Sequence, residues 1–324
     1  MKRRAFTQGL VGAAAALPLA THAQQPARVP RVAVLLYSTP QSDLQMPAFR
    51  GGLRERGYTE GRNLSIEYRY ADGRPERLPE LAAELVGTKP DVLFSIGGEV
   101  TSVAVKATRT IPIVFTSSAD PVQLQFVASI ARPGGSATGA TFLLDELAAK
   151  RLELLKEASP AISRVACIYN PDHLDNELFE AERAARTLGM QLHPLEVRDL
   201  GAFDGAFEMA TKARVDALYV VSSRLTLRGI ERLIGYAARN RLPLAGGWGA
   251  WAQQGGLLSY GPNVNEMVRG AVTYMDKILK GASPGDLPVQ QPTKFELVLN
   301  LKTAKSLNLT VPASVLSRAD ETIE

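Results

Sequence analysis

The sequence predicts an α/β protein of two Rossmann-like lobes, each with a parallel sheet, joined by hinge crossover strands. Short apolar runs alternate with amphipathic stretches along the chain, which is typical of βαβ units. The alternation forms two successive series, separated by the turn-rich segment 132–135. A chain of this length can bury two separate cores. We therefore expect two similar lobes.

The first series predicts strands that alternate with helices. The helices carry apolar residues at helical spacing, as Leu78, Leu81 and Leu85 do in the second of them. Gly57 suits the C-cap of the first helix. The predicted strands are 32–37, 64–70, 92–96 and 113–115, and the predicted helices are 49–57, 76–86 and 100–108.

The second series starts after the turn at 132–135 and repeats the pattern. Residues 137–142 lead out of the turn. The predicted strands are 165–169, 191–195, 217–221 and 242–245, and the predicted helices are 146–158, 176–188, 203–212 and 227–238. The junctions between the lobes are expected near 141–145 and 259–262.

The last segment follows a different pattern. A strong amphipathic helix is predicted over 265–279, and we expect it to pack back against the first lobe. A strand over 295–301 and a short helix with Pro312 follow. The first lobe is thus expected to hold residues 30–142 with about 262–290, and the second lobe 143–261. The sequence leaves open which lobe receives the tail 291–324.

The N-terminus has the three parts of a cleavable signal peptide over residues 1–23. Basic residues at 2–4 precede an uncharged stretch over 9–20, and Thr21-His22-Ala23 places small residues before a cut near Ala23. The uncharged stretch is shorter than the ~20 residues that span a membrane. Arg3-Arg4-Ala5-Phe6 resembles a twin-arginine signal, so both export routes stay open. We expect a periplasmic protein.

Charge argues against a nucleic-acid partner. The whole chain has a net charge of +4, from 37 basic and 33 acidic residues. Residues 1–23 hold three of the basic residues and none of the acidic ones, which leaves +1 for the rest. No basic run remains that would follow a phosphate backbone.

The residues that most chemistry needs are scarce. After the signal there is one cysteine, Cys167, in an apolar run where we expect a buried, unreactive thiol. The two histidines, His173 and His193, lie far apart and without metal-ligand spacing. Neither a phosphate-binding loop nor a nucleophile elbow is present. The sequence therefore predicts no metal, no cofactor and no enzyme activity.

Polar and aromatic residues follow the predicted strands. In open parallel sheets, ligands bind at the carboxyl ends of the strands. The candidate ligand-binding residues at these ends are Tyr37, Ser38, Gly98, Glu99, Ser117, Ser118 and Asp120 in the first lobe, and Tyr169, Ser222, Arg224 and Trp248 in the second.

These candidates suit a small ligand with a carboxylate. Ser117 and Ser118, or alternatively Arg224, would bind the carboxylate. An ammonium group would pair with an acidic candidate, and a ring would stack on an aromatic one. The alternative role of each serine is helix capping, and that of Trp248 is packing at the hinge.

Several segments together resemble the TrpX-like substrate-binding proteins of ABC importers. They are 49–64 (FRGGLRERGYTEGRNL), 111–139, 149–155 and 287–309, and the resemblance spans nearly all of the chain after the signal. It implies a type I periplasmic binding protein. Asp120-Pro121 fits the family pattern, whereas Ala119 replaces its usual glycine and Glu99 a small or apolar residue. The ligand therefore stays undefined.

The expected function is a solute receptor. The resemblance implies a monomer that binds a small organic ligand, an aromatic amino acid or aromatic carboxylate, and delivers it to an ABC permease in the inner membrane. A bilobal sensor module for a signalling partner is the first alternative, and an exported enzyme is the second.

Overall fold

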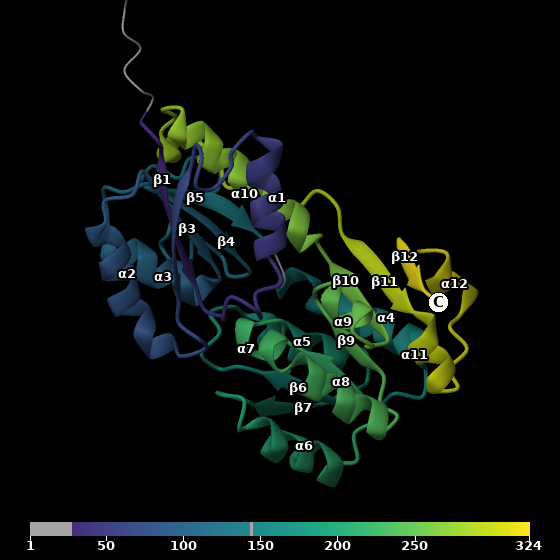
Figure 1. Cartoon of the computed structure of the whole chain (residues 1–324). Helices are drawn as coiled ribbons and strands as arrows, with labels where there is room; N and C mark the ends of the chain where they lie inside the picture. The colour runs from purple at the N-terminus through teal and green to yellow at the C-terminus, as the bar shows by residue number, and fades with distance from the viewer. Residues whose placement is uncertain (1–27, 143–144) are drawn as a thin grey trace, which may run out of the picture.

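The computed structural model describes residues 28–142 and 145–324. These residues form two sheets, each covered by helices on both faces (Figure 1). The five-stranded sheet has the order β2-β1-β3-β4-β5, and the seven-stranded sheet has the order β12-β11-β10-β9-β8-β6-β7. The signal-peptide prediction for residues 1–23 lies outside the described residues.

The first sheet is parallel throughout. One face packs on α2 and α3, and the other packs on α1 and on the much later helix α10. The strands are β1 (Arg31–Leu36), β2 (Ser65–Tyr70), β3 (Val92–Ile96), β4 (Ile113–Ser117) and β5 (Ala137–Thr141). The helices are α1 (Met46–Glu55), α2 (Leu78–Gly87), α3 (Gly98–Ala107) and α10 (Val264–Leu279).

The second sheet is parallel except where β10 meets β11. Its strands are β6 (Arg164–Tyr169), β7 (Gln191–Glu196), β8 (Ala217–Val220), β9 (Leu244–Gly246), β10 (Leu258–Gly261), β11 (Glu296–Asn300) and β12 (Glu321–Ile323). Its helices are α4 (Ala148–Ala158), α5 (Glu177–Thr187), α6 (Phe203–Lys212), α7 (Arg224–Arg228), α8 (Ile230–Arg239), α9 (Ala250–Gln253), α11 (Leu301–Ser306) and α12 (Ala313–Leu316).

The chain passes between the two sheets more than once. It leaves the first sheet after β5 and returns through the connection from β10 to α10. It then crosses again between α10 and β11, so the C-terminal strands β11 and β12 join the second sheet. The two-lobed α/β fold expected from the sequence is confirmed.

Two differences from the expected elements have local causes. The single helix expected over 227–238 is broken into α7 and α8 at Gly229, whose φ of −89° and ψ of 8° lie outside the α-helical range. Gly229 packs against the ring of Phe203, where a side chain would collide. A capping box between Ser223 and Thr226 also starts α7 three residues early. Strand β10 was not expected, because its sequence, LSYG, is short and contains glycine.

The core of each lobe is mainly apolar. Cys167 lies fully buried within β6, so the expectation of a buried thiol is confirmed, and burial raises the pKa of this thiol well above the ordinary value. The second lobe also buries an ion pair, because the side chains of Arg151 on α4 and Glu177 on α5 are both 0% exposed.

Candidate functional site

The carboxyl ends of both sheets meet where the two lobes touch. The first turn of α3 contributes Glu99, the loop after β4 contributes Ser118, and the loop after β6 contributes His173 from the other lobe. A second contact joins Arg224, at the start of α7, to Gln45 in the loop after β1. A third contact joins Asn176 to Gln123. The candidate site is therefore shared between lobes.

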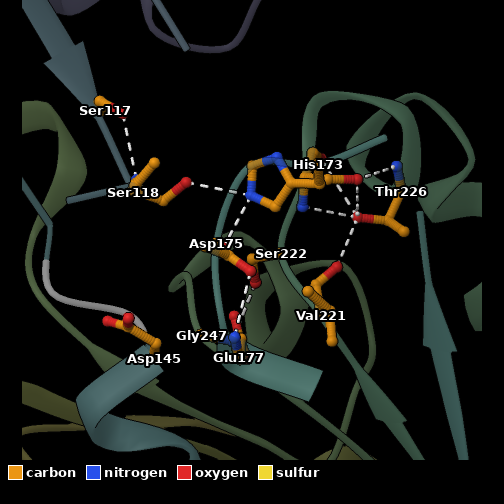
Figure 2. A network of polar contacts seen from close by, with 12 residues as sticks. Ser117, Ser118, Asp145, His173, Asp175, Glu177, Val221, Ser222, Thr226 and Gly247 are labelled. Carbon is orange, nitrogen blue, oxygen red and sulfur yellow. Dashed lines mark hydrogen bonds and ion pairs between the residues drawn. The ribbon is translucent and has the colours of Figure 1, made fainter. Parts of the chain in front are cut away.

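His173 stands at the centre of the first contact (Figure 2). Its Nδ1 lies 3.1 Å from Glu99 Oε1, and its Nε2 lies 3.0 Å from Ser118 Oγ. Asp175 from its own loop places Oδ2 2.8 Å from the same Nε2. The side chain of His173 is only 3% exposed. One buried imidazole thus meets two carboxylates and a hydroxyl.

This arrangement favours the charged imidazolium. Burial alone would lower the pKa of His173, but Asp175 and Glu99 together raise it well above the ordinary value. Burial would likewise raise the pKa values of Glu99 and Asp175, yet His173 holds both below their ordinary values. The three directions agree, since the positive imidazolium and the two negative carboxylates stabilise one another's charged forms.

Arg224 forms the second contact between the lobes. Its guanidinium donates to the side-chain oxygen of Gln45 and lies 5.7 Å from the centre of the Trp248 ring. Arg224 is 4% exposed and forms no ion pair with the described carboxylates. Burial lowers its pKa, against the influence of Asp43 and Glu99. An unpaired buried cation is costly, so this position favours an anion.

Trp248 completes the aromatic wall of the site. Its ring packs edge-on against Phe142, with centroids 6.5 Å apart and planes at 88°. The indole Nε1 is buried and has no hydrogen-bond partner among the described residues. The guanidinium of Arg224 and this free N–H are two donors that the fold leaves for another group.

Tyr37, Ser38 and Gly98 line the first-lobe side of the contact. Tyr37 and Ser38 are buried at the end of β1, and Gly98 starts α3. Burial and the nearby Glu99 raise the pKa of Tyr37, while Arg228 from the second lobe lowers it. Arg228 also lies so close to Gly73 that a side chain there would collide with its guanidinium.

Three of the predicted residues have local structural roles. Ser117 is fully buried, and its hydroxyl accepts from the backbone N–H of Ala119. Asp120 is exposed and accepts from the backbone N–H groups of the two residues after Pro121. Ser222 is fully buried and accepts from the N–H of Gly247 and the indole of Trp251. These oxygens already have partners.

Tyr169 lies apart from this centre. It is half-buried at the end of β6, and burial together with Glu196 raises the pKa of its hydroxyl. It packs beside the second-lobe core and makes none of the inter-lobe contacts described above.

A second charged cluster lies directly behind the site, within the second lobe. Arg151 donates from Nη1 to Glu177 Oε1 at 2.6 Å and to the Tyr219 hydroxyl at 3.1 Å, and from Nε to the Tyr260 carbonyl at 2.7 Å. The Tyr219 hydroxyl donates to the same oxygen of Glu177 at 2.7 Å. The backbone N–H of Glu177 donates to Asp175, which links this cluster to His173 (Figure 2).

The sequence reasoning missed His173, Asp175 and Gln45. The spacing of the histidines argues against a metal site at His173, and the sequence around it carries no other motif. The signal that would have found it is the rule already applied to the other strands, because residues 170–175 follow the carboxyl end of β6. Gln45 follows β1 in the same way.

Two cavities flank the inter-lobe contacts. The larger, of about 270 Å³, is bounded by Gln45, Trp248, Gln253 and the crossover residues Pro262 and Asn263. The smaller, of about 140 Å³, lies beside Ser118, Asp120 and the crossover residue Asp145. Both open next to the side chains that join the lobes.

Neither a metal centre nor a membrane span is found in the part of the chain that the structure describes. No group of three or more histidine, cysteine or carboxylate side chains there is arranged to hold a metal ion. No helix over those residues is long and apolar enough to cross a bilayer. The chemistry that these residues offer is hydrogen bonding, charge and aromatic stacking.

One feature of the site is shared with hydrolases. Ser118, His173 and Glu99 stand in the order of nucleophile, base and carboxylate, with the distances given above. The carboxylate of Asp175, 2.8 Å from Nε2, distinguishes this site, because its charge favours the protonated ring even though its Oδ2 makes no hydrogen bond to the nitrogen. An imidazolium cannot accept a proton from Ser118, so this charge state opposes activation of the hydroxyl.

Comparison with known proteins shows which family the sequence matches. The model of a family described as ABC transporter substrate binding protein matches residues 31–323. The chain is also similar to a tyrosine-binding protein of Clostridioides difficile, with 25% identity over 276 residues, which are 85% of this chain and 79% of that protein.

Two solved structures share the fold. A conserved domain protein from Vibrio cholerae superposes with a TM-score of 0.84 at 30% identity, covering 91% of this chain and all of that one. An ABC domain from Streptococcus pneumonia in complex with L-Trp superposes with a TM-score of 0.83 at 23% identity, covering 91% and 99%. The arrangement of the two lobes is therefore a known one.

Proposed function

The chain belongs to the family of ABC transporter substrate-binding proteins, and from this premise we propose that it is the periplasmic receptor of an ABC importer. The ligand binds between the lobes, and the closed form delivers it to a permease in the inner membrane. The signal-like residues 1–23 support export, and the match over residues 31–323 supports the transport role. Ligand binding shifts the equilibrium toward the closed form.

The ligand that we propose is a small aromatic amino acid or aromatic carboxylate. The observation that carries this proposal is the buried guanidinium of Arg224, which has no carboxylate partner among the described residues and lies on the Trp248 ring. A ligand carboxylate would neutralise Arg224, and a ligand ring would contact Trp248. The similarity to a tyrosine-binding protein supports the same class.

The carboxylate position differs from the first choice made from sequence. Ser117 is engaged with a backbone N–H, and Ser118 faces His173. Arg224, the alternative given from sequence, offers charge and has spare donors. We therefore assign the carboxylate to Arg224, with Gln45 and Trp248 beside it, and the ammonium group of an amino acid to Glu99, whose Oε2 is buried and unpartnered among the described residues.

A thermal-shift screen of the chain without residues 1–23 tests this proposal. L-tyrosine, L-tryptophan, phenylacetate, tyramine and L-leucine separate the contributions of ring, carboxylate and amine. A ligand at about 100 times its dissociation constant stabilises the folded protein by about 2.7 kcal/mol. We expect tyrosine or a related aromatic carboxylate to raise the melting temperature and tyramine not to. A shift with tyramine alone contradicts the assignment to Arg224.

An exported hydrolase is the second candidate, because Ser118, His173 and Glu99 are aligned. The imidazolium opposes this reading. Hydrolase activity is measured directly by incubating wild type and Asp175→Asn with aromatic esters and amides. The variant lacks the carboxylate that favours the imidazolium. We expect no product from wild type. Product formed by wild type and abolished in Ser118→Ala would replace the receptor proposal.

A further inference from the structure

We propose that His173 is the positioning residue that clamps the two lobes together, and that its protonation couples closure of the cleft to pH. This inference rests on the proposed receptor function, since it concerns the regulation of the same site. Its basis is geometric: one buried side chain of the second lobe meets Glu99 and Ser118 of the first lobe at both ring nitrogens.

The clamp needs a charged ring. Both nitrogens face carboxylate oxygens, Nδ1 that of Glu99 and Nε2 that of Asp175. A neutral imidazole carries one N–H, so one nitrogen lone pair would point at a carboxylate in a buried place. The imidazolium removes this repulsion: Nδ1 donates to Glu99, Nε2 hydrogen-bonds Ser118, and the nearby Asp175 Oδ2 is stabilised by the positive charge without a hydrogen bond. Lobe contact and protonation of His173 therefore favour each other.

The charges around His173 set the direction of the effect. Opening the lobes removes Glu99 and Ser118 from the ring but leaves Asp175, which belongs to the same loop as His173. Opening also hydrates the ring, which relieves the burial that lowers its pKa and weakens the influence of Asp175. Because the closed-form pKa lies well above the ordinary value despite burial, it is higher than that of the hydrated open form. Closure takes up a proton between these two pKa values, so closure weakens as the pH rises through the closed-state pKa.

Other charged groups lie near His173 and Glu99 but do not make the contact between the lobes that these two residues make. Arg224 of the second lobe also lies near Glu99, and it lowers the pKa of Glu99 less than His173 does. Arg151 and Glu177 lie behind Asp175, and Asp145 of the crossover stands near Asp175. None of these groups bridges the lobes at His173. At acid pH the clamp is lost when Glu99 itself becomes protonated.

The remaining histidine of the described chain provides a matched control. His193 lies in β7 of the second lobe, where its Nε2 is buried and has no partner among the described residues. Strand β7 is the last in the order of the second sheet, and His193 takes part in none of the inter-lobe contacts described above. A His193→Gln variant removes an imidazole from the same lobe and leaves the clamp intact.

Energy transfer between dyes on the two lobes measures closure without any ligand. Glu80→Cys on α2 and Met209→Cys on α6 are exposed positions at the outer sides of the two lobes (Figure 1), and the buried Cys167 is protected from labelling. The closed fraction is recorded from pH 6 to pH 9.5 for wild type, His173→Gln, Glu99→Gln and His193→Gln, all carrying the dye pair.

We expect the closed-to-open ratio of wild type and His193→Gln to fall as the pH rises, by up to about tenfold per pH unit, the limit for one proton. His173→Gln and Glu99→Gln should close less at pH 6 and show no pH dependence. Glu99→Gln tests the clamp from the other lobe if His173→Gln does not fold. A pH-independent wild type, or a His173→Gln profile parallel to wild type, overturns the proposal.

The same dyes separate this inference from the receptor proposal. If His173→Gln and Glu99→Gln lose the pH dependence while no aromatic carboxylate changes the melting temperature of wild type, the clamp stands and the proposed ligand class fails. If tyrosine or a related compound binds with the same pH profile to wild type and His173→Gln, the receptor stands and the clamp fails.

Discussion

Two buried clusters of charge lie side by side in this protein, and they differ in where their partners come from. Arg151, Glu177 and Tyr219 all belong to the second lobe. His173 also belongs to the second lobe, but it meets Glu99 and Ser118 of the first. Asp175 connects the two clusters through the backbone N–H of Glu177.

The comparison separates stability from function. A buried ion pair within one lobe is lost only when that lobe unfolds, so changing it alters the free energy of unfolding. A buried contact between lobes is lost whenever the cleft opens, so changing it alters the open–closed equilibrium and ligand affinity. Similar chemistry thus serves the fold in one place and binding in the other.

The largest expected effect is on the Arg151 cluster. Arg151→Met leaves Glu177 buried without its cation and removes the bond to the Tyr260 carbonyl. The free energy of unfolding should fall by about 3 kcal/mol, measured by urea denaturation. Lys150→Met is the control, because the neighbouring Lys150–Glu153 pair is exposed and should change stability by less than about 1 kcal/mol. Equal losses in both variants would contradict the distinction.

A pH experiment sharpens the same point. Burial, with help from Asp175, raises the pKa of Glu177 from 4.5 to about 7, although Arg151 and Tyr219 oppose the rise. Ionising the buried carboxyl therefore costs stability that Arg151 offsets only in part: the protein is most stable with respect to this group below pH 4.5, and up to about 3 kcal/mol is lost as the pH rises through 7. The difference in unfolding free energy between wild type and Glu177→Gln should therefore change over this range.

Changes at the contacts between the lobes should lower ligand affinity and have little effect on the free energy of unfolding. Arg224→Met removes the cation that we assign to the ligand carboxylate. Affinity should fall by about 2 kcal/mol, roughly 30-fold, while the free energy of unfolding changes little. Calorimetric titration with the best ligand of the screen measures this. Arg232→Met on α8, which removes an exposed pair with Asp204, should leave affinity unchanged. Equal affinities for Arg224→Met and wild type would place the carboxylate elsewhere.

The smallest expected effect distinguishes the two tryptophans. Trp248→Phe weakens the stacking surface under Arg224, so affinity should fall by about 1 kcal/mol. Trp251 is fully buried and donates to Ser222 within the second lobe, so Trp251→Phe should lower stability and spare affinity. Calorimetric titration should show the loss of affinity only in Trp248→Phe, and urea denaturation should show the loss of stability mainly in Trp251→Phe. A loss of affinity in Trp251→Phe alone would contradict the placement of Trp248 in the ligand site.

The fold was predictable because its signals are local. Buried strands such as 92–96 and amphipathic helices such as 203–212 follow directly from short patterns of apolar residues, and the structure places them at those residues. The break at Gly229 was not predictable, because a glycine inside a helical pattern does not by itself end a helix, and its packing against Phe203 of another helix is not visible in the sequence. The strand β10 depends on pairing with β9 and β11 rather than on its own composition.

The candidate site was only partly predictable. The strand-end rule led to Glu99, Ser118, Arg224 and Trp248, which the structure brings to the contact between the lobes. It also led to Asp120 and Ser222, which the backbone uses instead. Which hydroxyl caps a turn and which faces the other lobe depends on side-chain direction. His173 acquires its importance only from Glu99, which lies 74 residues away in the sequence.

The most direct test of the receptor account is the distance between the lobes as a function of ligand. Energy transfer in the Glu80→Cys/Met209→Cys protein is recorded during titration with the aromatic carboxylate that most raises the melting temperature. We predict a saturable rise in the closed fraction, with the dissociation constant found by calorimetry. A ligand that stabilises the protein but leaves the inter-lobe distance unchanged would show that it binds outside the cleft, and would contradict the account.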